Sequence, residues 1–243
     1  MRAVALALVG LPLAGLAAEP PAVAAFSAQS PGSALPAPWR VLVPPRAKAP
    51  SFALVGDAGV TVLRVHSEAA AGTVAHALRV DPAGRPTLAW RWKVDRVVDS
   101  ADLAVKGGDD FAARVYVFFA VPAAELPLAD RIRLAIARLV YGQALPGAAI
   151  CYVWDNRHPV GASSWSPYTD RVRTVVLESG SARVGQWVDE RRDLVADYRA
   201  AFGARAPLHD ISGIAAGNDT DQTRESATAW FGDFRIETAG GAR

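Results

Sequence analysis

The sequence contains little cysteine: Cys151 is the single cysteine among 243 residues. One cysteine cannot form a disulfide within the chain, so no disulfide framework supports the fold. Cys151 lies in the apolar run AAICYVWD, which is typical of a buried structural thiol rather than of a reactive nucleophile. The chain must therefore obtain its stability from a hydrophobic core, and it is long enough to form one.

Catalytic signatures are also missing. The sequence has no G-x-S-x-G nucleophile elbow, no H-E-x-x-H metal motif, no phosphate-binding loop and no dinucleotide fingerprint. The four histidines occur singly, at His66, His76, His158 and His209. The run LHDIS places a histidine, an aspartate and a serine together, but a catalytic triad is assembled in space, so we interpret this run as coincidence. The sequence does not decide whether the protein is an enzyme.

A strong charge of either sign is absent as well. Lys and Arg number 26 and Asp and Glu number 24, which gives a formal net charge of +2. A nearly neutral chain has no electrostatic footprint for nucleic acid or for an anionic membrane. We therefore expect no nucleic-acid partner.

The first residues, MRAVALALVGLPLAGLAA, contain one basic residue followed by a short apolar run that ends in small residues. This pattern is typical of a secretory signal peptide, residues 1–18, and the run is too short for a membrane anchor. We predict cleavage after Ala18, with cleavage after Ala24 as the alternative. The protein is then periplasmic or secreted, with no membrane span after cleavage.

Domain organisation follows from the distribution of proline, alanine and β-branched residues. Residues 19–35 predict a flexible leader, residues 36–237 a single domain and residues 238–243 a loose tail. Within the domain, short alternating or β-branched segments recur between turn signals, at 39–43, 52–55, 60–66, 73–80, 87–95, 111–120, 149–155, 171–178, 211–217 and 228–237. They predict a mainly β fold, an antiparallel β-sandwich of the jelly-roll type. Two short decorating helices are expected in LADRIRLAIARLVYG and DERRDLVADYRAAFG.

Two predicted strands are regular enough for their faces to be assigned. Side chains alternate between the two sides of a strand, so period two separates a core face from a wetter face. The core faces carry Trp90, Trp92, Val115 and Val117, and the opposite faces carry Arg91, Arg114 and Tyr116.

Aromatic, basic and acidic side chains on the wetter faces are the candidate ligand-binding residues. They are Arg91, Arg114, Tyr116, Tyr152, Trp154 and Asp233. Aromatic rings stack on the apolar faces of sugar rings, whereas arginine and aspartate form hydrogen bonds to hydroxyl groups. This combination suits a shallow glycan groove. The alternative is that the two helices cover this face and make these residues a second core.

Acidic residues gather in the run GNDTDQTRES, where Asp219 and Asp221 are candidate calcium ligands because calcium binds carboxylate and carbonyl oxygens. The run does not have the glycine and the terminal glutamate of an EF-hand loop at the required spacing. The alternative is a polar turn whose side chains bond to the backbone, and Asp109 and Asp110 allow the same two interpretations. No cofactor other than calcium is indicated. A glycosidase needs two carboxyl groups about 5–10 Å apart, a distance that sequence does not give.

Several long runs carry a family resemblance: AWRWKV, GGDDFAARVYVFF, YVWDN, GQWVDERRDLVADYRAAFG and AWFGDFRIE. In this order they are similar to bacterial exported proteins of the family called domain of unknown function 3047, over roughly residues 36–237. The resemblance implies export and a shared fold, and it transfers no catalytic residue. The family's run TDTDNT reads NDTDQT here, so both aspartates remain and Gln222 replaces an asparagine. The closing strand is also similar to the last strand of jelly-roll carbohydrate-binding modules.

These observations predict an exported protein that binds a glycan or an envelope polysaccharide. One alternative is a carbohydrate-active hydrolase or lyase that uses a pair of carboxylates. A second alternative is a structural envelope protein whose groove receives a partner peptide.

Overall fold

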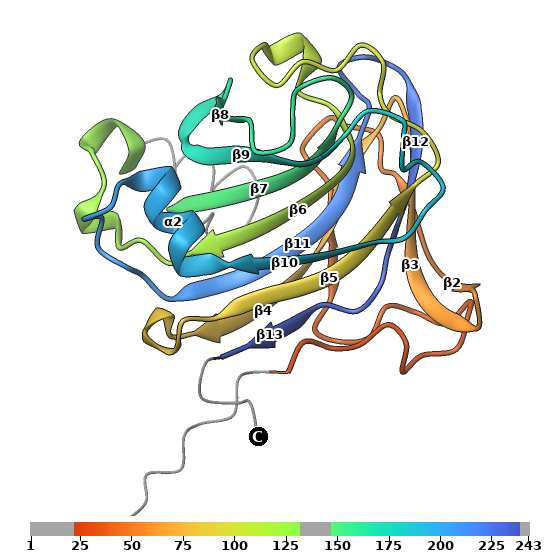
Figure 1. Ribbon diagram of the computed structural model, residues 1–243, viewed down its shortest axis with the longest axis horizontal. Coiled ribbons are helices and arrows are strands. Elements are labelled where there is room, and N and C mark those ends of the chain that lie inside the picture. The colour runs from red at the N-terminus through yellow and green to blue at the C-terminus, as the bar shows by residue number, and fades with distance from the viewer. Residues whose placement is uncertain (1–21, 132–146, 239–243) are drawn as a thin grey trace, which may run out of the picture.

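The computed structural model describes residues 22–131 and 147–238, which form two β-sheets packed face to face (Figure 1). The proposed signal peptide at 1–18 and most of the tail at 238–243 lie outside the described residues. So do residues 132–146, which hold most of the first predicted helix. Within the described part of the chain, no helix is long and apolar enough to cross a membrane.

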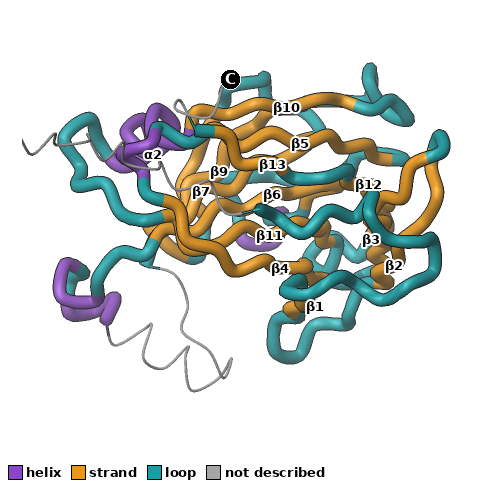
Figure 2. Tube along the Cα trace, turned by 90° about the horizontal axis from the view of Figure 1, so that it is seen from below, coloured by secondary structure: helices purple, strands orange, loops and turns teal. Residues whose placement is uncertain are grey.

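The larger sheet has seven strands in the order β1-β4-β11-β6-β7-β9-β8. Its strands are β1 (Arg40–Leu42), β4 (Ala71–Val80), β6 (Phe111–Phe119), β7 (Ala148–Asp155), β8 (Ser163–Ser166), β9 (Thr169–Ser179) and β11 (Ile211–Asp219). Figure 2 shows β1 at the edge of this sheet, beside β4.

The smaller sheet has six strands and contains the order β10-β5-β12-β3-β2, with β13 paired to β5. Its strands are β2 (Ser51–Asp57), β3 (Val60–Glu68), β5 (Thr87–Val94), β10 (Val188–Asp193), β12 (Ser226–Phe231) and β13 (Arg235–Glu237). The chain changes sheet at most connections, passing from β3 to β4, β5 and β6 and later from β9 to β10, β11 and β12. This arrangement is the predicted jelly-roll sandwich. The pairing is antiparallel except between β7 and β9, which run parallel.

The core between the sheets contains the side chains that alternation assigned to it. Trp90 and Trp92 are 2% and 0% exposed, and Val115 and Val117 are fully buried. The rings of Trp90 and Trp92 meet edge to face, with centroids 5.6 Å apart. The face assignment of β5 and of the middle of β6 is therefore confirmed.

The second predicted helix is only partly helical. Residues Val188–Asp193 form strand β10, which pairs with β5, and the helix α2 spans Leu194–Phe202 (Figure 1). Asp193 begins the helix because its carboxylate accepts hydrogen bonds from the backbone N–H groups of Val195 and Ala196. Gly203 ends the helix with a φ of 112°. The first predicted helix is helical at 128–131, where its described residues end.

Two other segments differ from the prediction. Strand β8 was not expected, and the segment 228–237 is divided into β12 and β13 by residues 232–234. The division reverses the alternation, so Phe231 and Phe234 are both buried, whereas regular period two would expose one of them.

The predicted flexible leader at 19–35 is wrong for its described part. Phe26 is fully buried, with its ring centroid 5.0 Å from Trp39 and 6.5 Å from Phe234. The backbone N–H of Ala24 donates to His76 Nε2, and Trp39 Nε1 donates to the Ala24 carbonyl oxygen. The segment is rich in proline and alanine, and its one aromatic residue, Phe26, gives no periodic signal in the sequence. The burial of Phe26 holds the segment on the sandwich.

Candidate functional site

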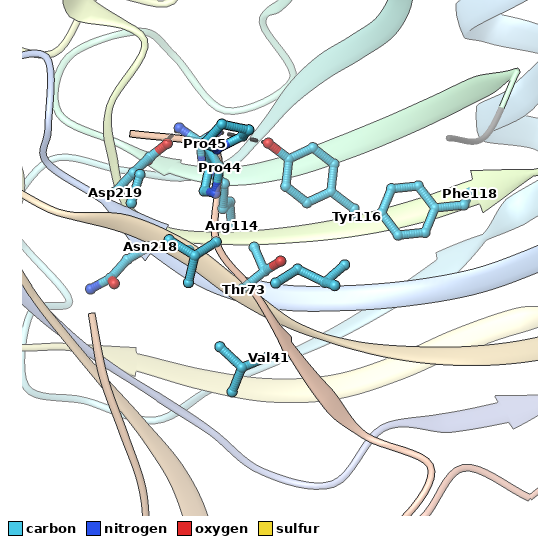
Figure 3. A pocket seen from close by; sticks show the side chains of 13 residues that line it. Val41, Pro44, Pro45, Thr73, Arg114, Tyr116, Phe118, Asn218 and Asp219 are labelled. Carbon is cyan, nitrogen blue, oxygen red and sulfur yellow. Dashed lines mark hydrogen bonds and ion pairs between the residues drawn. The ribbon is translucent and has the colours of Figure 1, made fainter. Parts of the chain in front are cut away.

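A groove of about 500 Å³ lies on the face of the seven-stranded sheet that points away from the core. Strands β4, β11 and β6 form its floor, and the segment Val41–Pro45, which includes the end of β1, forms one wall (Figure 3). Gly72 has no room for a side chain, because an added Cβ would lie 2.8 Å from Pro50 Cδ and 3.2 Å from the Leu42 carbonyl oxygen.

Strand β6 supplies the larger side chains of the groove. Because Val115 and Val117 point into the core, Arg114, Tyr116 and Phe118 line the groove on the other face. The rings of Tyr116 and Phe118 are nearly parallel, with an interplanar angle of 14° and centroids 5.8 Å apart. Figure 3 shows the two rings side by side along the strand. They form a short aromatic surface.

Arg114 connects this aromatic surface to the acidic end of the groove. Its side chain is almost fully buried and forms an ion pair with Asp219 on β11. One guanidinium nitrogen donates to Tyr116 Oη at 2.7 Å, and another donates to the Asp109 carbonyl oxygen at 2.9 Å. The guanidinium is therefore fixed by three partners and cannot turn freely toward a ligand.

The carboxyl group of Asp219 is buried beside this guanidinium. Burial raises the pKa of Asp219 well above its usual value, the Arg114 charge opposes this rise, and the neighbouring Asp110 and Asp109 increase it. Its Oδ1 atom also accepts a hydrogen bond from the Phe111 backbone N–H at 3.1 Å. The residue thus joins the end of β11 to the start of β6.

Three carboxylates meet at this end of the groove. Asp110, Asp219 and Asp221 each offer an oxygen atom, and these atoms lie within 4.8 Å of one another. The sequence showed two separate acidic turns, and the strand register brings them together because Asp219 pairs with Phe111. Burial raises the pKa of Asp221, and the charge of Asp110 raises it further. Burial also raises the pKa of Asp109.

Tyr152 and Trp154 do not lie on an exposed face, so this part of the sequence prediction is wrong. They are 0% and 1% exposed and pack in the core between the sheets. All eight residues of β7 are buried, and its one charged residue, Asp155, comes last, so the strand has no polar/apolar alternation that shows which side chains face the core. The polar atoms are satisfied internally: Tyr152 Oη donates to Asp197 and Trp154 Nε1 donates to the Gly180 carbonyl oxygen.

Arg91 and Asp233 lie away from the groove. Arg91 is on the outer face of the six-stranded sheet, where its guanidinium carbon is 4.5 Å from the centre of the Trp187 ring. Asp233 accepts hydrogen bonds from the backbone N–H and the hydroxyl of Ser27, so it holds the N-terminal segment. Of the six candidate ligand residues, the groove therefore contains Arg114 and Tyr116.

Sequence reasoning missed several residues of the groove. Phe118 follows Tyr116 by two positions, so the same alternation could have found it. Thr73 and the segment Val41–Pro45 reach the groove through the pairing of β1 with β4, which the sequence does not show.

Comparisons of structure found related folds at low sequence identity. A family 30 carbohydrate-binding module of a Clostridium thermocellum cellulosomal cellulase has a TM-score of 0.40 and 13% identity, covering 86% of this chain and 94% of that one. The endoglucanase Cel12A of Rhodothermus marinus has a TM-score of 0.44 and 10% identity, covering 82% and 90%. The xyloglucanase domain of NopAA, a type three effector of Sinorhizobium fredii, has a TM-score of 0.43 and 10% identity, covering 82% and 92%.

A search of curated protein sequences gave no match. The sequence profile of one family matches residues 37–235, which span both sheets of the sandwich. The chain belongs to this family, described as protein of unknown function (DUF3047).

Proposed function

We propose that this protein binds a neutral glycan chain in the groove on the seven-stranded sheet. The observation that carries the proposal is the Tyr116 and Phe118 pair, whose nearly parallel rings line a groove of about 500 Å³. Aromatic rings with polar groups beside them suit sugar rings, which have apolar faces and hydroxyl edges. The groove is also in the size range of small-molecule sites, about 300–1,000 Å³.

The polar lining supports a neutral ligand. Arg114 and Asp219 are the charged residues among the described lining of the groove, and they form an ion pair with each other. An anionic sugar would have to compete with Asp219 for the guanidinium, and a cationic one would have to compete with Arg114. Neutral hydroxyl groups can instead meet Tyr116 Oη and the Thr73 hydroxyl without separating this pair.

Binding without hydrolysis is better supported than catalysis. A glycosidase places two carboxyl groups on either side of the scissile bond. Among the described residues that line the groove, Asp219 is the one carboxylate, and it is held by Arg114. Asp110 lies close to it but is fully buried, so it does not reach a ligand in the groove.

Export is part of the proposal. The basic residue and apolar run at 1–18 are the features that support a signal peptide. A periplasmic or secreted location would bring the groove to envelope polysaccharides or to glycans outside the cell.

Binding to soluble neutral polysaccharides, such as β-glucans and xyloglucan, can be tested by affinity electrophoresis and calorimetry on the purified protein. We expect retardation by at least one neutral glycan and weaker or no retardation by a polyuronate. Tyr116→Ala and Phe118→Ala should each reduce affinity about tenfold or more, since stacking on an aromatic ring is lost.

Tyr168→Ala is the matched control, because Tyr168 is 55% exposed and does not line the groove. Equal loss of affinity in this variant would contradict the assignment to the groove. If the wild type releases reducing ends from a glycan and Asp219→Asn does not, the groove hydrolyses the glycan, and the proposal of binding without hydrolysis is wrong. A protein that binds no glycan but captures a peptide through the same two rings would favour the structural envelope protein.

A further inference from the structure

The acidic cluster at the end of the groove brings together carboxylates from distant parts of the chain. Asp110 precedes β6, Asp219 ends β11, and Asp221 lies in the turn that follows. Their nearest oxygens lie within 4.8 Å of one another. Carboxylates this close repel one another unless a positive charge lies between them.

Asp110 gives an independent indication of a missing partner. It is fully buried, and its Oδ2 atom accepts a hydrogen bond from the Thr223 backbone N–H at 2.6 Å. Its Oδ1 atom is also buried but has no hydrogen-bond partner among the described residues. A buried carboxylate oxygen without a partner is costly, because it has lost its hydration and gained no hydrogen bond in return.

The basic side chains nearby do not neutralise the cluster. Arg114 is the residue whose positive charge acts on Asp109, Asp219 and Asp221, and its ion pair is with Asp219. One guanidinium thus faces several carboxylates. Asp110 and Asp221 form no ion pair of their own that the described residues show.

We propose that Asp110, Asp219 and Asp221 bind a calcium ion. Calcium takes six to eight oxygen ligands at about 2.3–2.6 Å, so two ligand oxygens of one ion lie up to about 5 Å apart. The observed separations fit this span. Calcium also tolerates irregular geometry and completes its shell with carbonyl oxygens and water, which suits ligands from two loops and a strand end.

The proposed ion has a structural role. It joins the start of β6 to the end of β11 and the following turn, and Asp219 belongs to both the cluster and the groove lining. Calcium should therefore fix the acidic end of the groove and stabilise the folded chain, since a ligand that binds only the native state raises stability. The proposal does not depend on the identity of the groove ligand.

The test uses the metal alone. The purified protein is dialysed against EDTA, its metal content is checked by mass spectrometry, and calcium is then titrated by calorimetry and by thermal unfolding. We expect one calcium per chain and a melting temperature that rises by about 5–10 °C when calcium reaches a hundred times its dissociation constant. Magnesium at the same concentration should produce a smaller rise, because it demands shorter, octahedral bonds.

Asp221→Asn and Asp110→Asn should each weaken calcium affinity about tenfold or more, because a charged ligand is lost. Asp189→Asn is the matched control, since Asp189 is exposed on β10 of the other sheet. If Asp110→Asn does not fold, the calcium affinity of Asp221→Asn carries the test, because Asp221 is only half-buried. No calcium binding by the wild type, an equal response to magnesium, or an equal loss in Asp189→Asn would each overturn the proposal.

Discussion

Glu190 on β10 lies opposite Trp90, and its side chain is partly buried. Burial, and next the charge of Glu178, raise the pKa of Glu190 from 4.5 to about 7. Its Oε1 atom is buried without a hydrogen-bond partner in the described structure. At neutral pH the folded protein therefore holds a carboxyl group that ionises less readily than it does in the unfolded chain.

Glu190→Gln should make the protein more stable above pH 7. A raised pKa means that the folded state binds the proton more tightly, so the wild type loses stability as the pH rises from about 4.5 to about 7. Glutamine cannot ionise, so the variant should gain about 1–2 kcal/mol at pH 8 and little at pH 4, after allowance for partial exposure. Urea denaturation at both pH values measures this difference.

Glu68→Gln provides the control, because the Glu68 side chain is 72% exposed. Its pH profile should follow that of the wild type. If the free energy of unfolding of Glu190→Gln differs from that of the wild type by the same amount at pH 4 and pH 8, Glu190 ionises normally in the folded protein.

Single residues were predictable from sequence where polar and apolar side chains alternate. Arg114 stands between apolar residues of β6, so its face could be assigned. Tyr152 stands in a strand whose one charged residue comes last, and it was placed wrongly. The partners of a residue could not be predicted. Arg114 meets Asp219 only because β6 and β11 are neighbours in the sheet, which depends on the order of strands.

At the scale of elements, the junction of β10 and α2 shows how one side chain changes the local structure. Val188–Asp193 forms a strand by pairing with β5, and the Asp193 carboxylate then caps the helix. These backbone hydrogen bonds, first that from Ala196, lower the pKa of Asp193. The charged form of Asp193 is the one that stabilises the helix.

Asp193→Ala should lower the free energy of unfolding by about 1 kcal/mol at neutral pH, which is the usual cost of losing such a cap. A lowered pKa gives stability that is present above the unfolded pKa and is lost as the pH falls through the folded pKa. The difference from the wild type should therefore shrink in acid. Chemical denaturation at pH 7 and pH 3 measures it.

Asp189→Ala, on the exposed side of the same strand, should change stability by less than about 0.5 kcal/mol. An Asp193→Ala variant as stable as Asp189→Ala at neutral pH would show that the helix begins without this cap.

Most strands were predictable because each has its own apolar pattern and turn signals. Strand β10 was not, since DERRD has the composition of a helix surface and becomes a strand only by pairing with β5. Strand β8 has the sequence SSWS, too short and polar for a periodic signal, and it exists because β9 offers it an edge. Pairing between segments overrides local preference in both cases.

At the scale of the whole molecule, the sandwich extends beyond the strands to include the N-terminal segment. Phe26 lies in the main core, and Ser27 contacts Asp233 near the end of the chain. Figure 1 shows this segment, in red, on the side of the molecule where β13 lies. The class and the layered architecture could be predicted from composition and periodicity. The docking of this segment could not, because a single phenylalanine among prolines and alanines has no period.

Phe26→Ala should destabilise the protein by about 3–5 kcal/mol, as truncation of a fully buried aromatic residue does. Thermal and chemical unfolding of the purified variant measure this change. Val160→Ala is the control, because Val160 is 66% exposed and its truncation should cost less than about 0.5 kcal/mol. Similar small losses in both variants would show that the segment contributes little to the core.

The contact between Ser27 and Asp233 joins residues that are 206 positions apart. A ribosome makes the chain from its N-terminus, so Phe26 emerges long before Phe234. The aromatic cluster of Phe26, Trp39 and Phe234 cannot close until Phe234 has been made. A chain that stops before Phe234 leaves Phe26 and Trp39 without one of their aromatic partners, so truncation at this point removes part of the cluster that holds the N-terminal segment.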